Sequence, residues 1–108
     1  MGATLQITPS AAAELGRQAA VAGTAGQMHL DLVSGHCERH VIRLQPGSLG
    51  GVPVARGDGL TLHAPAAQVS ELGGLCLDYR SDLSGGGFLI TARSGIRNCA
   101  CGSAFTRL

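Results

Sequence analysis

Four cysteines carry most of the reactive chemistry in this chain. Two of them, Cys99 and Cys101, stand one residue apart in the stretch RNCACGSAF near its end. Gly, Ser and Ala surround these two thiols, and such a composition predicts a loose tail. Free cysteines otherwise behave as small apolar residues that prefer the core. Exposed thiols on a loose tail therefore indicate metal binding or redox chemistry.

The spacing of the two thiols restricts that chemistry. Residues two apart in an extended chain have Cα atoms about 6.6 Å apart, at the edge of the range that a disulfide tolerates. Both thiolates can reach one metal centre, because such residues share a face of the chain. The sequence contains no Cys-x-x-Cys pair, so the usual zinc-ribbon and thioredoxin spacings are missing.

A third thiol, Cys37, lies in VSGHCERH between two predicted strands, where a side chain is exposed and well anchored. If the tail folds back over this loop, three thiolates converge. A stable iron–sulfur cluster normally uses four cysteines, so a partner subunit or another ligand would supply the fourth. His36 and Cys76 are candidate secondary ligands, although Cys76 alternates with leucines in GLCLDYR, as a packed strand residue does.

Composition excludes several classes of function. The 108 residues fit one domain, 1–108, and a net charge of +1 argues against a general nucleic-acid binder. No apolar run reaches the length of a membrane span, and the N-terminus does not resemble a secretory signal, so we expect a cytoplasmic protein. No carboxylate or Ser/His partner stands at a recognisable spacing from Asp78, and we expect no enzymatic activity. With three aromatic residues, the core must be aliphatic.

The elements that position these thiols are predicted from periodicity and turn residues. A helix should run from the capping residue Thr8 to Gly23, and a short second helix over 65–73. Strands are expected over 27–33, 40–44, 75–80 and 88–92, with a further pair around the Gly-Asp-Gly turn at 57–59. His29 and His63 alternate with strand aliphatics and should face solvent. The chain is therefore mostly β with an N-terminal helix, and a flexible cysteine tail over about 95–108 follows the last predicted strand.

The cysteine pattern resembles the HesB/IscA family of A-type iron–sulfur carriers, whose signature is a lone cysteine followed by Cys-Gly-Cys-Gly near the C-terminus. The likeness spans nearly the whole chain, since ITPSAAAEL resembles the opening helix and LVSGHC the strand and loop of the first cysteine. LDYRSDLSGGGF resembles the family's IDY…GF stretch, with Leu77, Asp78, Tyr79, Gly87 and Phe88 in register. The chain departs from the family at His36-Cys37-Glu38-Arg39, where the family has Gly-Cys-Ser-Gly, and at Cys-Ala-Cys, where the family has Cys-Gly-Cys.

The resemblance implies a compact β-sandwich or pseudo-barrel that works as a homodimer or larger assembly. It implies that Cys37, Cys99 and Cys101 bind iron or a [2Fe–2S] or [4Fe–4S] cluster and pass it to apo-proteins. The partners would be a scaffold and cysteine desulfurase system on one side and apo iron–sulfur proteins on the other.

The residues themselves leave other functions open. The three thiolates with His36 or Cys76 could hold a single zinc or iron ion, which predicts one metal and no labile sulfide. Cys99 and Cys101 could instead cycle with Cys37 as a thiol redox protein, which predicts a metal-free protein with a defined reduction potential. A divergent relative that kept only the fold is a further possibility, because GHCERH is unusual.

Overall fold

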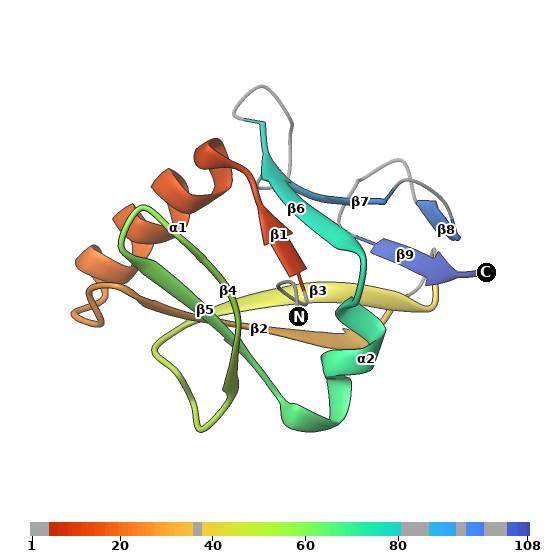
Figure 1. The fold of residues 1–108 in the computed structure, drawn as a ribbon, viewed down its shortest axis with the longest axis horizontal. Helices are drawn as coiled ribbons and strands as arrows, with labels where there is room; N and C mark the ends of the chain where they lie inside the picture. The colour runs from red at the N-terminus through yellow and green to blue at the C-terminus, as the bar shows by residue number, and fades with distance from the viewer. Residues whose placement is uncertain (1–4, 36–37, 81–86, 93–94, 99–103) are drawn as a thin grey trace.

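The computed structural model describes residues 5–35, 38–80, 87–92, 95–98 and 104–108, and of Asn98 it describes the backbone alone. The described chain forms two β-sheets with one long helix beside them (Figure 1). In chain order the elements are β1 (Leu5–Ile7), α1 (Pro9–Val21), β2 (Gln27–Ser34), β3 (His40–Pro46), β4 (Val52–Gly57), β5 (Leu60–Ala64), the 3-10 turn η1 (Ala66–Gln68), α2 (Val69–Leu72), β6 (Leu75–Tyr79), β7 (Phe88–Thr91), β8 (Ile96–Asn98) and β9 (Ala104–Arg107). The predicted mostly β fold with an N-terminal helix and a short second helix is confirmed.

The two sheets enclose the core. The larger sheet has the strand order β4-β5-β2-β3-β9-β8 and the smaller one the order β1-β6-β7. Figure 1 shows β1 and β6 side by side, inclined to β2 and β3 of the larger sheet. The largest fully buried side chains come from both sheets and both helices: Leu5, Leu15, Met28, Leu30, Leu60, Leu62, Leu72, Leu75, Leu77, Ile90 and Phe105. The expectation of an aliphatic core is confirmed, with Phe105 as its one fully buried aromatic ring among the described residues.

Helix α1 begins as the sequence predicts. The Thr8 hydroxyl accepts a hydrogen bond from the Ala11 N–H at 3.2 Å, and Pro9 occupies the first helical position, where no N–H is needed. The face that carries Ala11 and Leu15 is buried. Small alanine side chains on this face allow the helix to approach the strands closely, and α1 packs against β6 and β2, on the opposite side of the molecule from the C-terminus (Figure 1).

Strand β2 shows one correct and one wrong prediction. Met28, Leu30 and Leu32 are buried, as the alternation predicts. His29 was expected to face solvent, but only 5% of it is exposed, and its Nδ1 has no hydrogen-bond partner among the described residues. The reason is its position in the middle of the six-stranded sheet. His63 on β5 lies directly opposite, half-buried, with its Nδ1 3.2 Å from the Met28 carbonyl oxygen.

Asp31 on β2 and Arg43 on β3 form a cross-strand pair on the face of the sheet that also carries His29. Arg43 Nη2 lies 2.6 Å from Asp31 Oδ2. The hydrogen bond from Arg43 is the main cause of a lowered pKa at Asp31. A lowered folded-state pKa means that the pair stabilises the fold above the ordinary carboxyl pKa of about 4 and is lost as pH falls through the folded value. In urea titrations we expect Asp31→Asn to be less stable than the parent at pH 6, and the difference to shrink as the pH falls below the ordinary carboxyl pKa of about 4. A difference that grows on acidification would contradict this assignment.

The C-terminal region differs from the predicted flexible tail. Residues 96–98 and 104–107 form β8 and β9, and β9 lies between β3 and β8 in the larger sheet. Ala104 and Phe105 are fully buried. The physical reason is that Phe105 supplies an aromatic ring to a core built otherwise from aliphatic side chains, while Ala104 is small enough to pack under its neighbours. Residues 99–103 lie outside the described part of the chain.

The segment after β5 bends back along β2. The predicted helix over 65–73 is a 3-10 turn, η1, followed by the one-turn helix α2. From η1 the Gln68 side-chain amide accepts a hydrogen bond from the Leu32 N–H at 2.8 Å and donates one to the Leu32 carbonyl at 3.0 Å. In the described ranges, no helix has the length and apolar character needed to cross a membrane.

Candidate metal-binding region

The predicted ligands Cys37, Cys99 and Cys101, and the secondary candidate His36, lie outside the described residues. The structure does describe the residues that flank them in sequence. These flanking residues belong to two hairpins, β2–β3 and β8–β9, and their geometry decides how the two cysteine-bearing segments are anchored.

The β2–β3 hairpin closes just before the first cysteine. Ser34 pairs with His40, and the Gly35 N–H donates to the Arg39 carbonyl at 3.3 Å. A Cβ atom at Gly35 would lie 2.4 Å from the Glu38 carbonyl oxygen and 2.6 Å from Val41 Cγ2. Glycine is therefore required at this position because the hairpin backbone folds back tightly on itself, which fixes both ends of the segment that carries Cys37.

The β8–β9 hairpin lies beside the first one in the same sheet. Phe105 on β9 pairs with His40 on one side and with Asn98 on the other. The residue after Asn98 is Cys99, and the residue three before Ala104 is Cys101. The sheet therefore brings the chain flanking Cys37 and the chain flanking the other two cysteines onto four neighbouring strands, in the order β2-β3-β9-β8.

A polar contact joins the two hairpins at Glu38, the residue that follows Cys37. Thr106 Oγ1 donates to Glu38 Oε1 at 2.6 Å, and Arg97 Nε donates to the same oxygen at 3.1 Å. The Arg39 N–H in turn donates to Thr106 Oγ1 at 2.9 Å. We call this set, formed by Glu38, the Arg39 N–H, Arg97 and Thr106, the Glu38 clamp.

The Glu38 carboxylate of the clamp is negatively charged and half-buried. The Thr106 hydroxyl is the main cause of a lowered pKa at Glu38, partial burial opposes the effect, and Arg97 adds to the lowering. Glu38 is thus held as a carboxylate, with its side chain only 10% exposed, whereas the Arg97 side chain is 63% exposed. Sequence reasoning missed this contact, since its members are separated by roughly sixty residues and Thr106 belongs to a strand of four residues.

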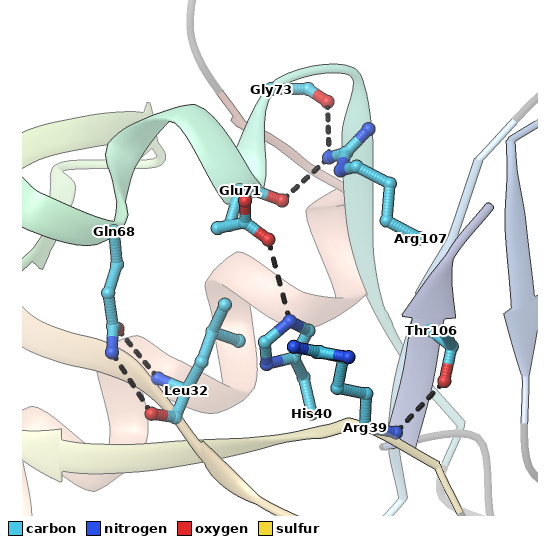
Figure 2. A network of polar contacts seen from close by, with 8 residues as sticks. All are labelled: Leu32, Arg39, His40, Gln68, Glu71, Gly73, Thr106 and Arg107. Atoms are coloured by element: carbon cyan, nitrogen blue, oxygen red, sulfur yellow. Dashed lines mark hydrogen bonds and ion pairs between the residues drawn. The ribbon is translucent and has the colours of Figure 1, made fainter.

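A second network braces the same strands from the side of α2 (Figure 2). His40 Nε2 lies 3.4 Å from Glu71 Oε1, and the His40 ring lies 5.5 Å, between centroids, from that of Phe105. Arg107 Nη2 donates to the carbonyl oxygens of Glu71 at 2.6 Å and Gly73 at 2.9 Å. The end of α2 therefore holds both the start of β3 and the end of β9.

Cys76 lies in the other sheet. It is a half-buried residue of β6, the middle strand of the three-stranded sheet, and its neighbours in register are Gln6 and Thr91. The structure therefore places it on a packed strand, and its part as a secondary ligand stays a prediction. Among the residues that the structure describes, no three His, Cys, Asp or Glu side chains gather closely enough to hold a metal ion.

The LDY stretch has a structural role. Asp78 Oδ1 accepts hydrogen bonds from the Thr8 hydroxyl at 2.7 Å and from the Tyr79 N–H at 2.8 Å. The Thr8 N–H donates to the Leu77 carbonyl at 3.0 Å. Asp78 thus connects the capping residue of α1 to strand β6, which accounts for this carboxylate without any acid–base chemistry.

The Gly-Phe pair that follows has a packing role. Gly87 has φ +81°, and a Cβ atom there would lie 2.5 Å from the Arg80 carbonyl oxygen. The Arg80 N–H donates to the Gly87 carbonyl at 2.8 Å, so the two strands β6 and β7 close tightly at this point. The rings of Tyr79 and Phe88 pack in a tilted arrangement with centroids 4.8 Å apart.

Comparison with known proteins shows the fold. No family model matches the chain, and no curated protein sequence matches it significantly. The crystal structure of IscA with the [2Fe-2S] cluster superposes with a TM-score of 0.79 and 26% identity, over 96% of this chain and 98% of that one. The structure of Escherichia coli SufA, involved in biosynthesis of iron–sulfur clusters, gives 0.67 and 21% over 97% and 95%.

A solution NMR structure of a protein from Aquifex aeolicus gives a TM-score of 0.58 and 21% identity over 84% of this chain and 93% of that one. All three matches extend over most of both chains, so the likeness is one of whole domains. The chain therefore has the IscA/HesB-like fold that the sequence resemblance predicts.

Proposed function

We propose that this chain is an iron–sulfur cluster assembly and carrier protein. Its cargo would be iron or a [2Fe–2S] or [4Fe–4S] cluster, held by Cys37, Cys99 and Cys101. The observation that carries the proposal is the whole-chain likeness to IscA solved with its [2Fe-2S] cluster, at 26% identity. The presence of three cysteines in the family pattern adds to it.

The donor set suits this cargo. Iron–sulfur clusters are held by cysteine thiolates, normally four of them. One chain supplies three in this proposal, so the fourth position goes to a second copy of the chain, to His36 or to Cys76. A homodimer fits this requirement because it brings further thiolates to the same centre.

Transfer follows from thiolate exchange. A thiolate of the accepting apo-protein forms a bond to iron as one of the chain's own Fe–S(Cys) bonds breaks, and the released cysteine leaves as a thiolate or takes up a proton. The exchange needs no change in oxidation state. The chain acts as a carrier and not as an enzyme, in the cytoplasm, between a scaffold and cysteine desulfurase system and the apo-proteins that it supplies.

The first experiment is anaerobic reconstitution of the protein with iron, sulfide and thiol. We expect broad visible charge-transfer absorption with matched iron and labile sulfide. The triple variant Cys37→Ser, Cys99→Ser, Cys101→Ser should lose both. Cys76→Ser separates the candidates for the fourth position: loss of bound iron and sulfide would assign it to Cys76, which lies in the other sheet, and retention would assign it to His36 or to a second copy of the chain.

Other outcomes separate the competing functions. One tightly bound zinc or iron ion without labile sulfide would overturn the carrier proposal in favour of a mononuclear metal site. A colourless, metal-free protein with a reversible disulfide would favour a thiol redox protein. If the signal of the triple variant equals that of the parent, the three cysteines are not the ligands.

A further inference from the structure

We infer that Glu38 is a positioning residue that sets how firmly the cargo is held, because its carboxylate fastens the hairpin before and after Cys37 to the hairpin that flanks Cys99 and Cys101. This inference rests on the proposed function and adds a control of cargo release to it. The residue is one of the departures from the family pattern, which has Ser at this position and Gly at the next.

The contacts of the clamp bridge the two cysteine-bearing segments. Glu38 follows Cys37 directly, and Arg97 precedes Cys99 by two residues. The Glu38 carboxylate contacts Arg97 through both oxygens, at 3.1 and 3.3 Å. Any movement of Glu38 away from Arg97 must therefore break or stretch these contacts.

Thr106 makes the clamp continuous with the sheet. Its hydroxyl donates to Glu38 and accepts from the Arg39 N–H, so one side chain on β9 fixes both residues that follow Cys37. Hydrogen bonds in such a chain polarise and strengthen one another. The Glu38 side chain is only 10% exposed.

The clamp should slow the departure of the cargo. Release requires that thiolates from the two segments separate from the same iron atoms in turn. A clamp that holds Glu38 to Arg97 and Thr106 favours rebinding of a thiolate that has let go, because the effective concentration of that thiolate near the iron stays high. Loosening the clamp should raise the release rate and leave the identity of the ligands unchanged.

The first measurement tests whether the clamp forms in the protein without bound iron or cluster. Amide hydrogen exchange in the apo-protein should show the Arg39 N–H at least fivefold less protected in Glu38→Ala and Thr106→Val than in the parent. Thr106→Ser keeps the hydroxyl and should retain the protection. Glu14→Gln is the matched control, because it removes a carboxylate that also binds an arginine, Arg17, but lies on α1.

The second measurement gives the rate at which the protein releases its cluster to an acceptor. Reconstituted protein is mixed with apo-ferredoxin, and cluster transfer is followed by circular dichroism. We expect transfer at least fivefold faster from Glu38→Ala and Thr106→Val, at the same iron and sulfide content and visible spectrum, and parent rates from Thr106→Ser and Glu14→Gln.

The outcomes distinguish the two proposals. Lost protection of the Arg39 N–H with an unchanged transfer rate would overturn the positioning role while leaving the carrier function intact. Unchanged protection in Glu38→Ala would overturn the clamp itself. A parent protein that takes up no iron and sulfide would overturn the carrier function, and with it the role of Glu38 in release.

Discussion

Replacing Phe105 by alanine is expected to lower the free energy of unfolding by about 3–5 kcal/mol, the usual cost of removing a buried aromatic ring. Phe105 is fully buried and contacts the His40 ring, and its strand β9 lies between β3 and β8. Domains of this size are stable by about 5–15 kcal/mol in total, so the variant should be close to unfolding at 37 °C. Because β9 also carries Thr106, the Glu38 clamp should loosen as well.

Urea denaturation followed by far-UV circular dichroism would measure the effect. Leu108→Ala is the matched control, since this leucine lies three residues later and is 78% exposed. It should stay within about 0.5 kcal/mol of the parent. A Phe105→Ala variant as stable as the control would mean that β9 is not part of the cooperative core.

Gly35→Ala is expected to disturb the hairpin that carries Cys37. The added methyl group would overlap the Glu38 carbonyl oxygen at 2.4 Å and Val41 Cγ2 at 2.6 Å, so the backbone must shift. Overpacking of this kind costs about 1–3 kcal/mol. Because Glu38 itself must move, we also expect loss of hydrogen-exchange protection at the Arg39 N–H and a cluster content below half of the parent's after reconstitution.

Gly16→Ala tests whether the effect is specific to the hairpin. Gly16 lies within α1, and a Cβ atom there would meet nothing within 4 Å. Alanine should stabilise the helix by about 0.5–1 kcal/mol and leave the cluster content unchanged. Equal behaviour of the two variants in both measurements would refute a special role for Gly35.

Local signals in the sequence were enough to predict α1, most strands and the fold class. Thr8 and Pro9 specify the start of α1 through backbone chemistry that operates within one turn. The alternation of Met28, Leu30 and Leu32 specifies which face of β2 is buried, because successive side chains of a strand point to opposite faces. These predictions depend on neighbours in sequence, and the structure confirms them.

Three short strands, β1, β8 and β9, could not be predicted in this way. Each has only three or four residues, and none of them continues an alternating pattern along the chain. β1 is a strand because Leu5 and its neighbours pair with β6, some seventy residues later, and β9 because Phe105 fills the core. His29 was misjudged for a related reason, since its burial depends on β3 and β5 and not on its own strand.

For the candidate site, the sequence predicted ligands and the structure describes their supports. Cys37, Cys99 and Cys101 stay predictions, because they lie outside the described residues. The Glu38 clamp could not be inferred beforehand, since a contact between Glu38 and Thr106 exists only once β9 lies beside β3. Glu38, which departs from the family pattern in the sequence, is in the structure the attachment point of the second hairpin.

The hydrogen bonds of Gln68 have a consequence for the behaviour of the protein at high concentration. β5 pairs with β2 only as far as His29, so the N–H and carbonyl of Leu32 would otherwise form an open strand edge. Such an edge recruits strands from other molecules and seeds aggregation. The Gln68 amide offers one acceptor and one donor, as a peptide group does, and occupies that edge from within the same chain. One side chain therefore takes the place of a strand and helps to keep neighbouring molecules apart.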